Sequence, residues 1–328
     1  MDLPQSSSSS PRRVLSIQSH VVSGYVGNKS ATFPLQLLGY EVDVINSVHL
    51  SNHTGYSKGF KGQILQGAEL LALIEGLTDN GLLTSETTHL LTGYIGSESF
   101  LRSVLDVISR LRAINPSLKY VCDPVLGDRG KLYVPFSLVE IYKKEVVPQA
   151  YMVTPNEFEV ECLTGITIKN LDDACKACDE LHALGPTLVV ITSMAFASEP
   201  LSLTVLLSHK DGEKWHVVSP KIEGEYTGTG DLCAALLLAW EDDVSGAERQ
   251  SASSSVGGGG GAADDDGPRG LGAVLERVTN TMYKVIERTR RDAGTGKELR
   301  LVQSKRDIED GGRGGGLKAV KLKDGKRS

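Results

Sequence analysis

Long apolar runs are absent from this chain of 328 residues. None approaches the roughly 20 consecutive apolar residues that a membrane-spanning helix needs. The segment Met1–Ser10 is rich in serine and has neither the basic start nor the apolar core of a secretory signal. Positive charge is not in excess either, since the formal net charge is −6, which argues against a general nucleic-acid binder. We therefore expect a cytoplasmic protein with no membrane or nucleic-acid partner.

Cysteine is scarce, and the count of five is odd. An odd count in a long chain without a secretory signal indicates reduced thiols rather than a disulfide framework. Cys175 and Cys178 form a C-x-x-C pattern inside Leu171–Leu184, which is predicted to be a helix, and no second cysteine pair completes a zinc site. Ordinary helical packing is the favoured interpretation, and redox or metal chemistry is the alternative.

Several nucleotide-binding motifs are also missing. The chain has no G-x-x-x-x-G-K-[ST] sequence, no His-Arg-Asp or Asp-Phe-Gly motif, and no G-x-G-x-x-G between a strand and a helix. These absences argue against a P-loop enzyme, a protein kinase and a dinucleotide-dependent oxidoreductase. Phosphoryl transfer by this chain would need another structural class.

Short apolar segments alternate with segments of helical periodicity. This alternation predicts an α/β fold, with a central, mostly parallel sheet and helices on both faces. Ligands bind at the carboxyl ends of the strands in such sheets, and polar residues follow several of the predicted strands. The predicted strands are 13–17, 41–48, 89–92, 120–122, 151–153 and 187–191, and the predicted helices include 63–77, 100–114 and 232–240.

One domain is expected over residues 13–310, preceded by a disordered serine-rich tail at 1–12. Residues 251–270 contain runs of glycine and aspartate and are predicted to be a low-complexity surface insertion. Residues 311–328 are rich in glycine and basic residues and are predicted to be a disordered, solvated tail, with an anionic partner as the alternative.

The sequence Gly228-Thr229-Gly230-Asp231 precedes a dense apolar run. Glycines allow the backbone to approach a ligand closely, and the amides at the start of a helix attract anions. Such a site stabilises the charge that develops on a phosphoryl group during its transfer. Asp231 beside it is a candidate general base for an attacking hydroxyl. A glycine turn with a helix-capping aspartate is the alternative reading of these four residues.

A series of motifs follows in order along the chain: Ser16–Val21, Gly24–Asn28, Ser51–Tyr56, Leu91–Tyr94, Cys122–Asp128, Thr154–Asn156, Gly228–Asp231 and Gln303–Asp310. This series resembles the pyridoxal kinase family of the ribokinase-like superfamily. The Gly-Thr-Gly-Asp element alone would indicate the superfamily, whereas the whole series is specific to the family. Leu50 stands where the family often carries an aromatic residue, and Phe60 where tryptophan is common.

The resemblance implies a role for each matching position. Asp231 would be the catalytic base, and Gly228, Thr229 and Gly230 would stabilise the transferred phosphoryl group. Residues expected to bind the vitamin are Ser19, Val26, His53, Thr54 and Tyr94, together with Asp231. Residues expected to bind ATP are Asn156, Thr192, Ser193, Thr229 and Gly230. Asp128 and Glu159 would serve Mg²⁺, and Asp123, Thr154 and Thr192 would lie around K⁺.

The expected reaction is ATP-dependent phosphorylation of the 5′-hydroxyl of pyridoxal, and also of pyridoxine and pyridoxamine, in vitamin B6 salvage. The resemblance further implies a homodimer. A hydroxymethylpyrimidine or sugar kinase of the same fold is one alternative. A non-catalytic pyridoxal-binding protein is the other.

Overall fold

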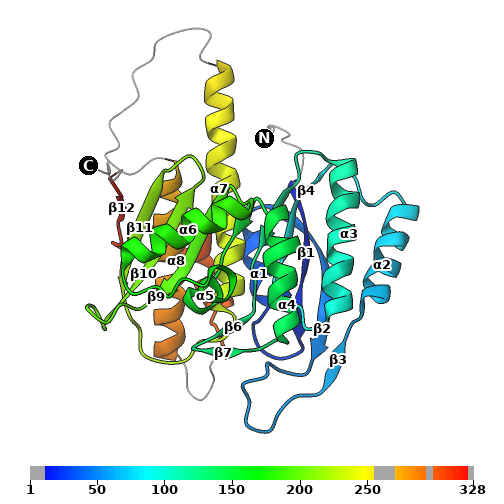
Figure 1. Ribbon diagram of the computed structural model, residues 1–328, viewed down its shortest axis with the longest axis horizontal. Helices are drawn as coiled ribbons and strands as arrows, with labels where there is room; N and C mark the ends of the chain where they lie inside the picture. The colour runs from blue at the N-terminus through cyan, green and yellow to red at the C-terminus, as the bar shows by residue number, and fades with distance from the viewer. Residues whose placement is uncertain (1–11, 255–269, 293–297, 324–328) are drawn as a thin grey trace, which may run out of the picture.

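A ten-stranded sheet forms the centre of the computed structural model, which describes residues 12–254, 270–292 and 298–323 (Figure 1). The strand order is β12-β11-β10-β9-β8-β5-β4-β1-β2-β3, and β2, β1, β4, β5, β8 and β9 are parallel. The strands are Arg12–Val21 (β1), Tyr40–Leu50 (β2), Gly62–Ile64 (β3), Thr87–Thr92 (β4), Lys119–Cys122 (β5), Met152–Val153 (β8), Leu188–Met194 (β9), Ser202–His209 (β10), Lys214–Pro220 (β11) and Ala319–Lys321 (β12). Gly127–Asp128 (β6) and Lys131–Leu132 (β7) pair as a separate small hairpin.

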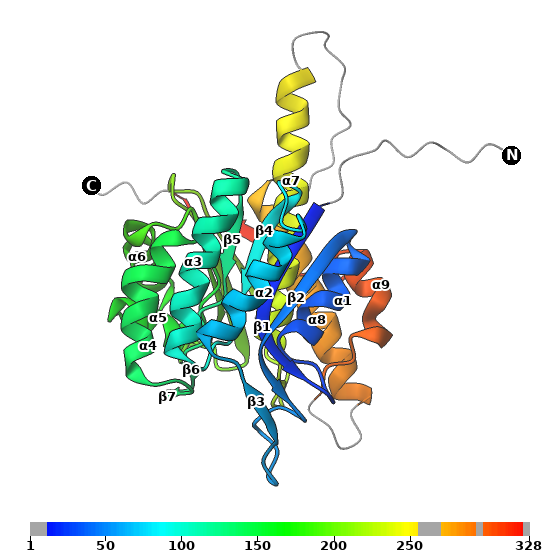
Figure 2. The ribbon, with the colours of Figure 1, turned by 90° about the vertical axis from the view of Figure 1, so that its right-hand side faces the viewer.

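Helices cover both faces of the sheet, as the two views in Figures 1 and 2 show. Helices α2 to α6 pack over one apolar core, and α1, α7, α8 and α9 pack over the other. The predicted α/β class is therefore confirmed. The helices are Asn28–Leu37 (α1), Gly67–Asp79 (α2), Glu98–Ile114 (α3), Phe136–Ile141 (α4), Glu157–Thr164 (α5), Leu171–Leu184 (α6), Thr229–Ser254 (α7), Leu271–Asp292 (α8) and Lys305–Glu309 (α9).

The helix predicted over Gln63–Leu77 begins later, at Gly67. Gln66 and Glu69 form a capping box that fixes this start. Gln63 and Ile64 instead belong to β3, which pairs antiparallel with the end of β2. The prediction was wrong at these two residues because an apolar residue just before a helix extends the helical period without belonging to the helix.

Strand β9 does not end before Thr192, as predicted, but continues to Met194. The antiparallel neighbour β10 extends the hydrogen-bonded ladder, with Thr204 opposite Met194 and Leu206 opposite Ile191. Two residues of β9, Thr192 and Ser193, therefore lie opposite a single residue of β10, which is the arrangement of a β-bulge. Bulges redirect side chains and are common beside active sites.

The predicted disordered tail after residue 310 is wrong for the part of it that the structure describes. Strand β12 pairs antiparallel with β11, and Gly311 and Gly312 are buried. A Cβ atom on Gly312 would lie 2.4 Å from the backbone nitrogen of Thr281 in α8. The glycines are there because the backbone passes against α8 at close range, rather than because the segment is solvated.

Other predicted segments fall partly outside the described residues. Residues 1–11, 255–269 and 324–328 are among those that the structure does not describe, so the serine-rich tail and most of the insertion lie there. Residues 251–254 of the predicted insertion are the last turn of α7. Helix α6 spans the predicted Leu171–Leu184, where Cys178 is buried in the core and Cys175 packs against it as a free thiol. Burial raises the pKa of both thiols, which supports the packing interpretation of the C-x-x-C pattern.

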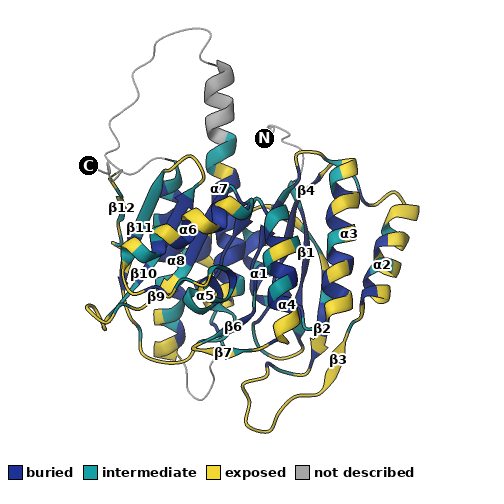
Figure 3. Ribbon diagram, in the orientation of Figure 1, coloured by how far each residue is buried: buried dark blue, intermediate teal, exposed yellow. Residues whose placement is uncertain are grey.

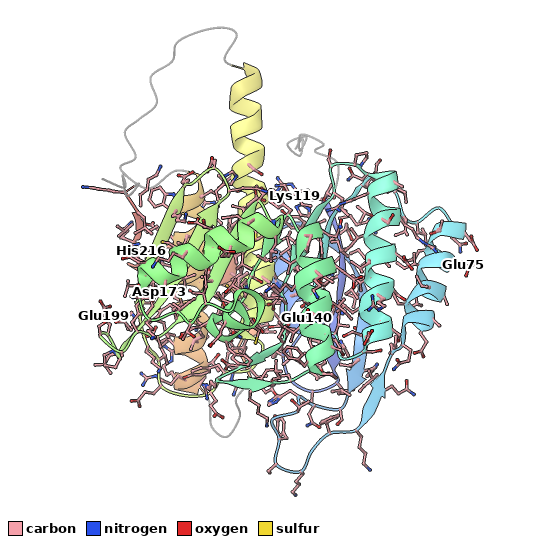
Figure 4. All side chains as sticks on the ribbon, viewed as in Figure 1. Glu75, Lys119, Glu140, Asp173, Glu199 and His216 are labelled. Atoms are coloured by element: carbon pink, nitrogen blue, oxygen red, sulfur yellow. The ribbon has the colours of Figure 1, made fainter. Side chains whose placement is uncertain are left out.

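The residues at the carboxyl ends of the parallel strands differ from those at the amino ends. The carboxyl ends of the parallel strands lie at the lower edge in Figure 1, where α7 begins and the β6–β7 hairpin projects. Lys119, at the amino end of β5 and labelled in Figure 4, lies at the other edge, with its Nζ 2.7 Å from Glu241 and 3.4 Å from Asp242 of α7. None of the helices among the described residues is long and apolar enough to cross a bilayer.

Candidate active site

The start of α7 forms the predicted anion site. Gly228 has φ +81°, and a Cβ atom there would lie 2.1 Å from the carbonyl oxygen of Tyr25, so only glycine fits. Ser30 Oγ donates to the Gly228 carbonyl at 2.8 Å and fixes the turn. The helix begins at Thr229, which places the Thr229 and Gly230 amides in its first turn, where N–H groups have no intrahelical acceptor. Helix polarity and these amides together favour an anion here.

Asp231 follows in the same helical turn. Its carboxylate is half-buried and lies beside the backbone N–H of Gly27. Burial raises the pKa of Asp231, and the hydrogen bonds to its carboxylate oppose that rise. Gly27, with φ +52°, leaves no room for a side chain, because a Cβ atom would lie 2.0 Å from the Ser19 carbonyl oxygen. The predicted base and the predicted vitamin residue Ser19 therefore lie on either side of Gly27.

A second carboxylate, Asp123, lies directly behind the anion site. A Cβ atom on Gly230 would be 3.4 Å from Asp123 Oδ2. Asp123 is buried, and its pKa is well above the ordinary value because of burial first and the charges of Glu159 and Asp231 second. The buried Thr154 Oγ1 lies beside it without a hydrogen bond of normal geometry.

Glu159 is held by backbone amides from two segments. Its Oε1 accepts from Leu126 at 3.0 Å and its Oε2 from Asn156 at 2.8 Å. Asn156 reciprocates by accepting from the Glu159 N–H at 2.9 Å, so the two residues form the capping box of α5. Burial outweighs these bonds and raises the pKa of Glu159 to about 8. Asn156 Nδ2 also donates to the Gly127 carbonyl at 2.8 Å, which holds the loop that carries Asp128.

The donor set around these residues is made of oxygen atoms. Buried carboxylates with raised pKa values and an unpaired buried hydroxyl suit a hard cation such as Mg²⁺ or K⁺. Across the described parts of the chain, no three His, Cys, Asp or Glu side chains converge closely enough to hold a metal ion by themselves. Mg²⁺ commonly keeps several waters and takes only one or two carboxylates, so this sparse arrangement fits it.

A cavity of about 790 Å³ opens beside the anion site. Of the predicted residues, it is lined by Asp128, Asn156, Thr192, Ser193, Thr229 and Gly230. The bulge in β9 brings Thr192 and Ser193 to this wall. The opposite wall was not predicted from the sequence: it consists of apolar side chains from β10, the segment after β11 and α8, including Leu203, Val205, Ile222, Val278, Met282 and Ile286. In the sequence such residues are indistinguishable from core.

The predicted vitamin residues lie on the other side of Asp231, outside this cavity. Val26 belongs to a small buried apolar cluster with Val21, Val48 and Leu50, and Tyr94 packs against the cluster. His53 and Thr54 come from the loop between β2 and β3, where His53 is buried and Thr54 is exposed. The residues predicted to bind ATP and the vitamin thus lie on opposite sides of the anion site in the structure, and their roles remain predictions.

The chain is similar to several known proteins in sequence and in structure. The sequence model of the phosphomethylpyrimidine kinase family matches residues 82–247. The pyridoxal kinase of Arabidopsis thaliana is 48% identical over 91% of each chain. The human pyridoxal kinase is 43% identical over 91% of this chain and 95% of its own. The solved structure of the Leishmania donovani pyridoxal kinase, in complex with ADP and pyridoxine, has a TM-score of 0.80 and 34% identity over 95% of this chain and 99% of its own.

These relatives match nearly the whole chain, and they match its fold as well as its sequence. The chain belongs to the pyridoxal kinase family, within the ribokinase-like fold.

Proposed function

We propose that this protein transfers the γ-phosphoryl group of ATP to the 5′-hydroxyl of pyridoxal, pyridoxine and pyridoxamine, giving the 5′-phosphates. One observation carries the proposal: the anion site at Gly228–Asp231 joins a nucleotide-sized cavity on one side to the Ser19–Gly27 segment on the other. Relatives named pyridoxal kinase, one of them solved with ADP and pyridoxine, support this assignment.

Asp231 is the general base of the proposed mechanism. Its carboxylate lies beside the Gly27 N–H, and its raised pKa makes it a better proton acceptor. The base removes the proton of the 5′-hydroxyl as the oxygen attacks the γ-phosphorus in line with the leaving ADP. The amides of Thr229 and Gly230 then stabilise the charge on the transferred group.

Cations would neutralise the phosphates and the buried carboxylates. Asp128 and Glu159 would serve Mg²⁺, through water at Glu159, whose two oxygens already accept backbone amides. Asp123, Thr154 and Thr192 would lie around K⁺, with the unpaired Thr154 Oγ1 available as a ligand. When bound, the cations supply charge neutralisation and orientation of the nucleotide.

ATP is assigned to the cavity. Its adenine fits the apolar wall formed by Leu203, Val278 and Met282. Thr192, Ser193 and Asn156 line the phosphate end, although the Asn156 side chain is also bonded within its own capping box. The vitamin ring is assigned to Ser19, Thr54 and His53, with Val26 and Tyr94 as apolar walls.

Two further proposals concern assembly and location. Val44, Phe60 and Ile64 are exposed apolar residues on β2, the loop after it and β3 (42%, 47% and 51% exposed), which supports a homodimer formed through this edge. Mass measurement in solution tests it. The five cysteines are free in the structure, which supports residence in a reducing compartment such as the cytoplasm.

A substrate panel tests the proposed reaction. Formation of pyridoxal 5′-phosphate is measured with and without ATP, Mg²⁺ and K⁺, and hydroxymethylpyrimidine and ribose serve as competing acceptors. ATP-dependent turnover that prefers pyridoxal supports the proposal. Preference for hydroxymethylpyrimidine would refute it. Binding of pyridoxal without turnover would identify a non-catalytic relative.

A further inference from the structure

Glu298 connects parts of the chain that are far apart in sequence. Its Oε2 accepts a hydrogen bond from the Tyr25 N–H at 2.8 Å, and its Oε1 accepts one from the Tyr56 hydroxyl at 3.0 Å. The same Oε1 lies 3.4 Å from Nε2 of His53. The backbone of Glu298 also forms a parallel bridge with Thr227, which immediately precedes the anion site. One carboxylate therefore touches both sides of the entrance to the vitamin site.

The Glu298 carboxylate occupies the space that a side chain at residue 24 would fill. Gly24 has φ +100°, and a Cβ atom there would lie 2.4 Å from each Glu298 oxygen. The glycine lets the carboxylate sit against the turn between β1 and α1. Val26 lies two residues after Gly24 in this turn, and the backbone N–H of Gly27, next to Val26, lies beside the Asp231 carboxylate. The Glu298 carboxylate thus binds the same turn that positions the base, Asp231.

Residues 51–61 form the loop after β2. Nearly all of its side chains are exposed, and it projects from the lower edge in Figure 3. Several of its bonds are internal, such as those from Ser51 N–H to the Lys61 carbonyl and from Asn52 Nδ2 to the Gly59 carbonyl. Backbone bonds from Ser23 and Val22 hold its start. Contacts to Glu298 secure its middle.

We propose that Glu298 is a positioning residue for the vitamin side of the site: by binding Tyr25 and Tyr56 together, it holds the loop that carries His53 and Thr54 against the turn that orients Asp231. The proposal rests on the assignment of the vitamin to this side. It makes a carboxylate far from the reacting atoms a determinant of vitamin affinity and leaves the nucleotide cavity unaffected, because Glu298 does not line that cavity.

Glu298→Gln tests the proposal, because Tyr25 and Tyr56 donate to different oxygens of Glu298 and glutamine replaces one of these oxygens by an NH2 group, which cannot accept. The KM and the Kd for pyridoxal should both rise by about tenfold, because one charge-assisted hydrogen bond is lost. The KM for ATP should change by less than about twofold, since a local loop change does not reach that cavity. The midpoint of thermal unfolding is measured alongside.

Tyr56→Phe removes one of the two bonds and should raise the KM for pyridoxal by a smaller factor. Added to Glu298→Gln, it should have little further effect, because both changes break the same contact. Glu309→Gln, an exposed glutamate in α9, is the matched control and should alter neither KM. Equal rises in both KM values of Glu298→Gln, or unchanged pyridoxal binding, would overturn the proposal. Since the Kd for pyridoxal is measured without ATP by calorimetry, the result stands even if the wild-type protein lacks turnover.

Discussion

Gly230 faces Asp123 at the start of α7: a methyl group on Gly230 would lie 3.4 Å from Asp123 Oδ2, which is ordinary van der Waals distance. Gly230→Ala should therefore fold normally but place a methyl group in the anion site. We expect kcat to fall by at least about tenfold, because oxyanion donors are sensitive to small displacements. The midpoint of thermal unfolding should be unchanged.

The matched comparison is Gly228→Ala, where the methyl group would clash with the Tyr25 carbonyl and φ is +81°. This variant should lose about 1–3 kcal/mol of stability as well as activity. Scanning calorimetry and initial rates on both variants separate the two effects. Loss of folding in Gly230→Ala would contradict the packing described for it.

Asp231→Asn should retain ATP binding and lose most turnover. Asparagine keeps the shape of the side chain but cannot accept the hydroxyl proton, and a positioned base contributes about 10²–10⁴-fold. Asp243→Asn, on the exposed side of the same helix, should retain activity. Single-turnover rates and calorimetric ATP titration give the two quantities. Near-normal turnover in Asp231→Asn would remove this residue from the mechanism.

Ser19→Ala should raise the KM for pyridoxal by about threefold to tenfold, the value of one hydrogen bond, while the KM for ATP stays constant. Ser16→Ala on the same strand is the contrast, because Ser16 Oγ donates to Asn28 in the interior at 2.8 Å. That variant should lower the thermal midpoint and leave the pyridoxal KM unchanged. A rise in the ATP KM of Ser19→Ala would place the serine on the wrong side of the anion site.

Met282→Glu should raise the KM for ATP without affecting pyridoxal binding. Met282 lines the apolar wall of the cavity, and a carboxylate there would repel the nucleotide and need its own hydration. Met282→Leu keeps the wall apolar and should be close to wild type. Steady-state kinetics with each substrate varied in turn gives both constants, and an unchanged ATP KM in the glutamate variant would move adenine elsewhere.

Asp242 should make stability dependent on acid pH. Burial alone would raise the pKa of Asp242, but His89, Lys119 and Arg12 outweigh it and lower the pKa below its ordinary 3.8. The resulting stabilisation is fully present above pH 3.8 and is lost as the pH falls through the folded-state pKa. Thermal midpoints of the wild type and Asp242→Asn should therefore differ at neutral pH and converge in acid. A constant difference would show that the charge is not responsible.

The sequence predicted the order of strands and helices well because the apolar periods of buried strands and covering helices are local. The same local signals failed at Gln63 and Ile64, where pairing with β2 decides the structure. They failed again at Gly311 and Gly312, since glycine in a flexible tail and glycine in a close packing contact look alike in sequence.

The residues of the site likewise fall into those that local sequence signals could predict and those that they could not. Asp123, Glu159 and Asp231 belong to recognisable motifs, and the structure brings their charges together. The apolar wall that includes Leu203 and Met282 carries no motif, because an apolar residue facing a ligand has the same chemistry as one facing the core. Glu298 escaped prediction because its partners are more than 240 residues away along the chain.

Helix α7 starts at the anion site and ends beyond the opposite edge of the sheet, about 39 Å away at 1.5 Å per residue (Figure 2). Helix α8 begins on that same side, beside Tyr151 and Glu241. A fluorescent reporter or an affinity handle joined at Ser254 or Leu271 would thus have its attachment point separated from the reacting atoms by the depth of the sheet. These two helix ends are the place to attach a probe when the enzyme must be immobilised or followed in a cell without disturbing its turnover.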